Sequence, residues 1–173
     1  MSDDDLYVGF GVGGNLEDSI GEVLKALDFL HGLKGFSNWR GSALYRSSPI
    51  DCPPGSPDFV NAVAVALVDP NMEPTKVLIT LQEYEKQRGR PEVRDRNSPR
   101  PVDLDILFWG QQQRVSTLLT LPHPRMMLRR FVLEPLVEVL PDYVDPVTQQ
   151  MAVDILFKIP VDPLLKRIEI KEP

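Results

Sequence analysis

The chain has 173 residues, which is enough for one domain with a substantial hydrophobic core. Its formal net charge of −6 argues against general binding of nucleic acid, and no apolar run approaches the roughly 20 residues that span a membrane. The single cysteine excludes an internal disulfide, and the acidic first residues are unlike a signal peptide, so we expect a cytoplasmic protein.

The first half of the chain predicts strands and helices in the order βαββα. Apolar residues alternate in the strands and recur every three or four positions in the helices. The predicted elements are strands at Leu6–Phe10, Trp39–Tyr45 and Phe59–Leu67, a helix that includes Ile20–Leu30, and a helix at Pro74–Arg88. Ser19 with Glu22 has the pattern of a capping box, with Asn15 or Asp18 as alternative starts of the first helix. Gly89 is the expected stop of the second helix.

The second half begins with a strand over 102–108 and completes a βαββαβ order. That order is typical of a ferredoxin-like α+β fold with an antiparallel sheet. Extra C-terminal elements are expected: a strand near Val115–Leu119 and helices around Arg125–Val139 and Thr148–Lys158. Residues 1–160 are then a single domain, and residues 161–173 a tail that we expect to be partly disordered. A G-x-G-x-x-G match at 9–14 is weak, because the sequence lacks the parallel βα units of a dinucleotide-binding fold.

Two carboxylates mark the strand over 102–108. Successive side chains of a strand point to opposite faces, so Asp103 and Asp105 share one face with Leu107. The opposite face is expected to carry Val102, Leu104, Ile106 and Phe108. Carboxylates two residues apart, about 6–7 Å between Cα atoms, reach one shared cation or a pair of cations. The pair therefore predicts a divalent-cation site.

An arginine-rich segment precedes these carboxylates and runs against the acidic balance of the chain. It contains Arg88, Arg90, Arg94, Arg96 and Arg100. Guanidinium groups suit phosphate oxygens, and Mg²⁺ suits carboxylates together with phosphates. A solvated, salt-bridged loop beside an edge strand is the alternative for either feature alone. Together they favour a site for a polyphosphate and Mg²⁺.

The segment Arg100–Gly110 closely resembles the signature of the 6-hydroxymethyl-7,8-dihydropterin pyrophosphokinase family. The resemblance extends from about Tyr7 to about Asp145, because further short motifs occur in the family's order. These motifs are Gly13-Gly14-Asn15, Tyr45-Arg46-Ser47, Phe59-Val60-Asn61, Glu85 with Gly89-Arg90, Pro122-His123 with Arg125-Met126, and Arg129 with Phe131. The chain departs from the family at Glu92 and Asn97, where an arginine and an aromatic residue are common.

The resemblance implies transfer of pyrophosphate from ATP to the 6-hydroxymethyl oxygen of the dihydropterin in folate biosynthesis. It implies a monomeric enzyme whose substrates are ATP and 6-hydroxymethyl-7,8-dihydropterin, with no nucleic-acid or membrane partner. Asp103 and Asp105 would bind two Mg²⁺ ions, and the catalytic set would add Arg90, Arg96 and Arg100. The ATP-binding residues would be Glu85, Arg90, Arg100, Ile106, His123 and Arg129. The pterin-binding residues would be Ser47, Ile50, Phe59, Asn61 and Phe131.

Two other functions remain open from the residues themselves. Another Mg²⁺-dependent nucleotidyl or phosphoryl transferase on the same scaffold would keep the aspartates and arginines but would not need Phe59, Asn61 and Phe131. A non-enzymatic, ferredoxin-like RNA-binding module would need exposed aromatic residues on a basic sheet face. Asp103 and Asp105 on the central strand argue against such a module.

Overall fold

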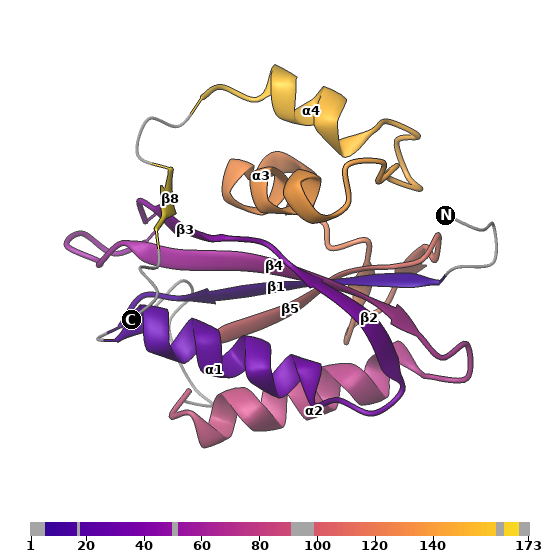
Figure 1. The fold of residues 1–173 in the computed structure, drawn as a ribbon, viewed down its shortest axis with the longest axis horizontal. Helices are drawn as coiled ribbons and strands as arrows, with labels where there is room; N and C mark the ends of the chain where they lie inside the picture. Colours follow the sequence, from indigo (N-terminus) through magenta and orange to yellow (C-terminus); the bar gives the residue numbers. More distant parts are fainter. Residues whose placement is uncertain (1–5, 17, 50–51, 91–98, 162–164, 170–173) are drawn as a thin grey trace.

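A six-stranded antiparallel sheet carries the fold, and helices cover both of its faces (Figure 1). The computed structural model describes residues 6–16, 18–49, 52–90, 99–161 and 165–169. The strands are β1 (Tyr7–Gly14), β2 (Phe36–Gly41), β3 (Leu44–Ser47), β4 (Phe59–Val68), β5 (Asp103–Trp109), β6 (Arg114–Val115), β7 (Thr120–Leu121) and β8 (Lys166–Ile168). The helices are α1 (Ser19–His31), α2 (Pro74–Gln87), the 3-10 helix η1 (Met126–Leu128), α3 (Arg130–Val139) and α4 (Ala152–Lys158).

The strand order of the sheet is β5-β1-β4-β3-β8. Strand β3 pairs with the first part of β4, and β2 pairs with the last part of β4. All of these pairs are antiparallel, which confirms the predicted α+β ferredoxin-like core. A dinucleotide-binding fold is ruled out, because the glycine-rich strand β1 runs antiparallel to both of its neighbours.

Helices α1 and α2 pack on one face of the sheet and α3 packs on the other, with α4 outside α3 (Figure 1). Alternation along β4 supplies both cores. Val60, Ala62 and Ala64 pack with α1 and α2, whereas Val63 and Val65 pack with α3. Because β4 is buried on both faces, its sequence is almost continuously apolar, and the polar Asn61 is conspicuous within it.

Two strands replace the single one predicted at Trp39–Tyr45, so that prediction is wrong in extent. β2 begins earlier, and the chain breaks between β2 and β3 at Ser42 and Ala43. Ser42 keeps contact with β4 at the break, because its N–H donates to Val63 O (2.9 Å) and its Oγ accepts from Val63 N (3.0 Å). Ala43 N donates instead to the carboxylate of Glu138 (3.1 Å). A side chain of α3 therefore replaces a sheet partner at this point.

The predicted face of Phe108 is wrong, because a β-bulge interrupts β5. Gly9 pairs with Phe108 but Phe10 pairs with Ile106, which leaves Leu107 as the extra residue. Leu107 and Phe108 consequently both lie on the α3 side, where the Phe108 ring packs on that of Tyr143 (centroids 4.4 Å apart). The two aspartates precede the bulge and keep the predicted common face.

The C-terminal section departs from prediction in its element boundaries. The strand predicted near Val115–Leu119 is a hairpin of two short strands, β6 and β7, and the helix predicted from Arg125 begins as η1 before it becomes α3. Helix α4 begins after the position predicted near Thr148, because Asp145 Oδ2 accepts from both N (3.0 Å) and Oγ (2.8 Å) of Thr148 and holds a turn there. β8 lies in the segment predicted as a tail, and it pairs with β3 at the sheet edge.

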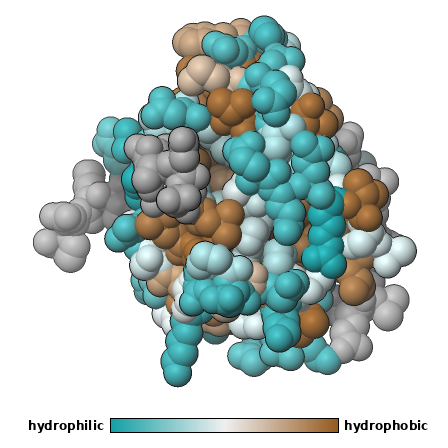
Figure 2. All heavy atoms as spheres, turned by 90° about the vertical axis from the view of Figure 1, so that its right-hand side faces the viewer, coloured by the Kyte–Doolittle hydropathy of each residue, from teal (hydrophilic) through white to brown (hydrophobic). Residues whose placement is uncertain are grey.

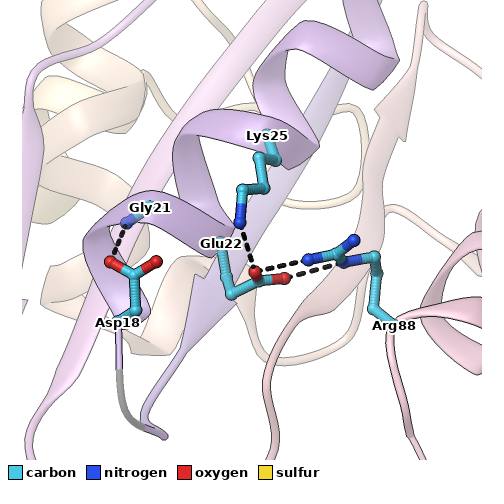
Figure 3. A network of polar contacts seen from close by, with 5 residues as sticks. All are labelled: Asp18, Gly21, Glu22, Lys25 and Arg88. Atoms are coloured by element: carbon cyan, nitrogen blue, oxygen red, sulfur yellow. Dashed lines mark hydrogen bonds and ion pairs between the residues drawn. The ribbon is translucent and has the colours of Figure 1, made fainter.

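Polar contacts fasten the start of α1 and the end of α2 (Figure 3). Asp18 is the N-cap among the candidate starts, since its Oδ1 accepts from Gly21 N (3.2 Å). Glu22 accepts from Lys25 (2.9 Å) and from both Nε (2.8 Å) and Nη2 (2.5 Å) of Arg88. Arg88 therefore binds α1, and the prediction that it belongs to a phosphate-binding cluster is not supported by its position.

The side of the molecule at the right of Figure 1 carries apolar residues as separate patches among hydrophilic ones (Figure 2). Apolar side chains at separate surface positions are normal for folded proteins. Across the described ranges, none of the helices has the length and apolar character that crossing a membrane requires.

Candidate active site

A pocket opens on the α3 side of the sheet, between β1, β4, β5 and the start of α3. The predicted site residues that line it are Ser47, Phe59, Asn61, Arg100, Asp103, Asp105, His123, Arg129 and Phe131. Strand alternation explains the convergence, because the side chains of β4 and β5 that contribute to it share one face of the sheet. The fold thus brings the predicted metal, phosphate and pterin residues to one cavity.

The other predicted residues are placed differently. Arg96 and Ile50 lie outside the described residues. The side chain of Ile106 is 2% exposed and belongs to the core on the α1 and α2 side of the sheet. Glu85 and Arg90 are not among the residues that line the pocket. They form an ion pair with each other, and Arg90 also forms an ion pair with Asp103.

Asp103 is held by two arginines. Arg90 Nη1 lies 2.7 Å from Asp103 Oδ1, and Arg100 Nη2 lies 2.5 Å from Asp103 Oδ2. Asp105 differs, because among the described residues no hydrogen bond or ion pair reaches its carboxylate. Burial, followed by the neighbouring charge of Asp103, raises the pKa of Asp105 to about 6. The charge of Asp103 is therefore neutralised by two arginines, whereas a bound cation would stabilise the charged form of Asp105.

The carboxylate pair fits a Mg²⁺ site that phosphate oxygens complete. Mg²⁺ in such sites is held by one or two carboxylates together with substrate phosphates and water. In the part of the chain that the structure describes, no group of three or more His, Cys, Asp or Glu side chains is placed to hold a metal. Two carboxylates leave coordination positions that phosphate oxygens and water can fill, so the donor set of Asp103 and Asp105 suits a cation that arrives with a polyphosphate.

Glu85 supports the carboxylate pair from α2. It is 4% exposed, its Oε1 accepts from Leu104 N of β5 (2.7 Å), and it forms an ion pair with Arg90. Burial raises the pKa of Glu85 to about 7, although the Leu104 N–H and the charge of Arg90 act in the opposite direction. Because Arg90 bridges Glu85 and Asp103, the position of the Asp103 carboxylate depends on α2.

Asn61 brings an amide to the opposite part of the pocket. It is 7% exposed, and its Nδ2 donates to Ser47 Oγ (2.9 Å). Ser47 is itself almost fully buried on the adjacent strand β3. An amide and a hydroxyl side by side offer both donors and acceptors, which suits the polar edge of a heterocycle.

Two phenylalanines line the pocket, each with an arginine beside its ring. The guanidinium carbon of Arg100 lies 5.3 Å from the ring centroid of Phe59, and that of Arg129 lies 5.4 Å from the ring centroid of Phe131. Aromatic rings stack on flat heterocycles, and guanidinium groups bind phosphate. Each pair therefore joins a surface for a ring to a group for a phosphate.

His123 contributes a neutral imidazole. Burial, together with the charges of Arg129 and Arg125, lowers the pKa of His123 to about 4. Its Nδ1 accepts from Arg125 N (3.2 Å), so the ring proton is on Nε2. Its backbone N–H donates to Leu107 O at the bulge of β5 (2.7 Å), which places it next to the aspartate strand.

Several pocket residues were not predicted from the sequence. Cys52 lies in the proline-rich loop between β3 and β4, where no local pattern marked it as part of a site. Leu107 lies on the face that alternation predicts for the two aspartates but was not named as a site residue, and Val132 directly follows the predicted Phe131. The signal for Cys52 would have been its position within that loop, which connects two strands carrying predicted pterin residues.

Comparison with known proteins agrees with this geometry. The sequence model of the 7,8-dihydro-6-hydroxymethylpterin-pyrophosphokinase (HPPK) family matches residues 9–141. A 2-amino-4-hydroxy-6-hydroxymethyldihydropteridine pyrophosphokinase of Pseudomonas aeruginosa is 40% identical over 138 residues, which are 79% of this chain and 81% of the relative. The enzyme of the same name from Synechocystis sp. is 37% identical over 136 residues, covering 79% of this chain and 67% of the relative.

Longer proteins match as well. The folic acid synthesis protein fol1 of Pneumocystis carinii is 39% identical over 145 residues, which are 84% of this chain but only 19% of that protein. The crystal structure of Plasmodium falciparum HPPK-DHPS with pteroate has a TM-score of 0.69 at 12% identity, covering 96% of this chain and 48% of that chain. This likeness shows the shared fold. The predicted family, with its pyrophosphokinase activity in folate synthesis, is confirmed by the sequence matches, and the chain belongs to the 7,8-dihydro-6-hydroxymethylpterin-pyrophosphokinase family.

Proposed function

We propose that this pocket transfers pyrophosphate from ATP to the 6-hydroxymethyl group of 6-hydroxymethyl-7,8-dihydropterin. A bond forms between the hydroxymethyl oxygen and the β-phosphorus of ATP. The bond from that phosphorus to the oxygen shared with the α-phosphorus breaks, and AMP leaves with the bonding electrons. The hydroxyl proton is released to water. Such a transfer needs alignment and charge neutralisation more than covalent participation by the protein.

The pterin is proposed to bind where aromatic and amide side chains meet. Phe59 and Phe131 would stack on its ring, and Asn61 with Ser47 would bind its polar edge. Ile50, outside the described residues, stays a prediction for the same subsite. The close approach of Asn61 to Ser47 supports this role, because the pair already orders the amide before a ligand binds.

The phosphates are proposed to bind between the arginines and the aspartates. Arg100, Arg129 and His123 would contact the phosphate oxygens, and Arg90 would act through Asp103. Asp103 and Asp105 would hold two Mg²⁺ ions, whose positive charge would be supplied to the phosphates during transfer. Arg96, Ile106 and Glu85 remain predicted ATP-site or catalytic residues, although Glu85 is engaged with Arg90 and β5.

One observation carries the proposal: the carboxylates of Asp103 and Asp105 line the same cavity as the Asn61 amide and the rings of Phe59 and Phe131. A different Mg²⁺-dependent transferase would account for the aspartates and arginines alone. The test is to supply ATP, Mg²⁺ and 6-hydroxymethyl-7,8-dihydropterin and to separate the products by chromatography. AMP and pterin pyrophosphate are expected in equal amounts. ADP in place of AMP would support the rival phosphoryl transferase, and no turnover would contradict the proposal.

Replacement of the aspartates sharpens that test. Asp103→Asn and Asp105→Asn are each expected to lower kcat by about 10²-fold or more, the scale of losing a major electrostatic stabiliser. Asp142→Asn, at an exposed position after α3, is the matched control and should retain wild-type turnover. Wild-type kcat in both active-site variants would contradict the metal assignment.

We also propose that the protein acts as a monomer in the cytoplasm, without a nucleic-acid or membrane partner. The acidic net charge supports the absence of a nucleic-acid partner. Light scattering on the purified protein tests the oligomeric state, and a mass of twice 19.5 kDa would contradict it.

A further inference from the structure

Asn15, directly after β1, joins three segments of the chain. It is 1% exposed. Its Nδ2 donates to Pro57 O (3.3 Å), its Oδ1 accepts from Arg100 N (2.9 Å), and its backbone N–H donates to Arg100 O (3.1 Å). A buried amide is costly unless it is hydrogen-bonded, so these contacts define where the two other segments lie.

The two bonded segments are the flanks of the pocket. Pro57 precedes Phe59 by two residues, on the side proposed for the pterin. Arg100 precedes Asp103 by three residues and binds its carboxylate, on the side proposed for the phosphates. The paired residues of β1 end at Gly14 in the ladder with β4 and at Gly13 in the ladder with β5, so the contacts of Asn15 position loops and not the sheet itself.

The two glycines before Asn15 let the same flanks approach β1 closely. A Cβ on Gly14 would lie 2.3 Å from Pro101 O, which belongs to the backbone that leads into β5. A Cβ on Gly13 would lie 3.2 Å from Oδ1 of Asn61, whose side-chain amide is on the side proposed for the pterin. The first contact requires the backbone to move, whereas the second requires a small shift of a side chain. Gly14 therefore contacts one flank, Gly13 the other, and Asn15 both.

We propose that Gly13-Gly14-Asn15 is a positioning element that holds the pterin flank and the phosphate flank of the pocket in register. The inference rests on the proposed function, because it concerns the alignment of that reaction's two substrates. Asn15 is not among the described residues that line the pocket, so it acts through the backbone of Pro57 and Arg100. Transfer needs reacting atoms about 3–3.5 Å apart, and a misplacement of about 1 Å can cost about 10²-fold in rate.

Alanine at each glycine tests the two flanks separately. Gly14→Ala is expected to lower kcat by about 10²-fold while the pterin Kd changes less than about threefold, because the backbone near Arg100 must shift. Gly13→Ala is expected to weaken pterin binding by about 3–10-fold with little change in kcat, because it displaces the Asn61 amide. Gly41→Ala is the matched control, since an added Cβ there meets nothing within 4 Å.

Two substitutions of Asn15 test the shared residue. Asn15→Ala is expected to lower kcat by about 10²-fold and to weaken pterin binding by about tenfold. Asn15→Asp keeps the acceptor for Arg100 N–H but replaces the donor that faces Pro57 O. Compared with Asn15→Ala, the Asn15→Asp variant should therefore have a partly restored kcat, and its pterin affinity should stay as low. Val23→Ala, in the fully buried core of α1, controls for simple loss of stability.

All kinetics are measured well below the melting temperature of each variant. If Asn15→Ala then behaves like Val23→Ala, with kcat and both dissociation constants within about twofold of wild type, the positioning role is overturned. Identical effects of Gly13→Ala and Gly14→Ala on both quantities would overturn the division into two flanks. Wild-type turnover is measured first. Its absence contradicts the proposed function, and the pterin dissociation constants of the variants still decide the positioning role.

Discussion

Arg100 lies beside the ring of Phe59, with its guanidinium carbon 5.3 Å from the ring centroid. The same guanidinium group contacts Asp103 through Nη2 at 2.5 Å. One arginine therefore touches both the surface proposed for the pterin and a carboxylate proposed for the metal. A planar guanidinium group allows this, because it can lie over an aromatic ring and donate from its N–H groups to a carboxylate at the same time.

Replacement of Arg100 by lysine keeps the charge and removes the fork. Arg100→Lys is expected to lower kcat by about 10–10²-fold, because a point charge cannot align phosphate oxygens as a fork does. The pterin Kd should change less than about threefold, since the ring of Phe59 remains. Steady-state kinetics and pterin calorimetry measure the two effects, with Arg46→Lys at an exposed position of β3 as the control. Equal losses in both quantities would contradict the phosphate role.

Truncation of Phe131 should separate the two substrates. Phe131→Ala is expected to weaken pterin binding by about 1–3 kcal/mol, the scale of one base–aromatic stack, while ATP affinity barely changes. Calorimetry with each ligand alone measures this. Phe157→Ala is a suitable control, because Phe157 is 85% exposed on α4. A similar loss for both ligands would mean that Phe131 only packs the core.

Asp105 is expected to destabilise the protein when no metal is bound. Burial raises its pKa from 3.8 to about 6, so the folded state prefers the protonated carboxyl. Its stabilising contribution is present below about pH 4 and is lost as the pH rises through about 6. The neutral amide of Asp105→Asn does not ionise, so this variant keeps its stability as the pH rises. Its free energy of unfolding at pH 7 should exceed that of wild type by about 1–3 kcal/mol.

Thermal unfolding in EDTA at several pH values tests that prediction. The difference in melting temperature between Asp105→Asn and wild type should grow from pH 4 to pH 6.5 and then level off. A pH-independent difference would contradict the assigned pKa direction. Added Mg²⁺ with ATP should stabilise wild type more than Asp105→Asn, because only wild type retains both carboxylates.

Arg88 is expected to act in stability and not in phosphate binding. It forms a two-point contact with Glu22 between α1 and α2, as Figure 3 shows. Arg88→Gln and Glu22→Gln should each lower the melting temperature slightly, and the KM for ATP should stay within about twofold of wild type. Arg129→Gln provides the contrast, since Arg129 lines the pocket. A large rise in the KM for ATP with Arg88→Gln would return Arg88 to the phosphate site.

Cys52 offers a chemical probe of the pocket. It is partly exposed and lines the cavity next to the pterin residues. We expect 6-hydroxymethyl-7,8-dihydropterin to slow the reaction of its thiol with a maleimide by about tenfold at saturation, because bound ligand blocks access. Mass spectrometry of the labelled protein follows the reaction, with Cys52→Ser as the unlabelled control. Equal labelling rates with and without the pterin would place the ring elsewhere.

The sequence by itself determined the fold class, the family and most of the pocket. Alternation along β5 put Asp103 and Asp105 on one face, and the apolar run of β4 made Asn61 stand out. These inferences succeed because strand periodicity and residue chemistry are local properties. The order of elements then limited the sheet to the ferredoxin-like arrangement, since each predicted helix follows a strand that needs cover.

Tertiary structure alone decided the features that depend on partners far away in the chain. The bulge at Leu107 turns Phe108 to the α3 side, and its position depends on how β5 pairs with β1. Arg88 resembles its neighbouring arginines in the sequence but is bound by Glu22 of α1, which no local pattern indicates. Cys52 lies in a loop whose two ends are brought together by the pairing of β3 with β4, and this pairing places it at the pocket. Periodicity fixes which way a side chain points, but the partner that it meets is set by packing between segments that are distant in sequence.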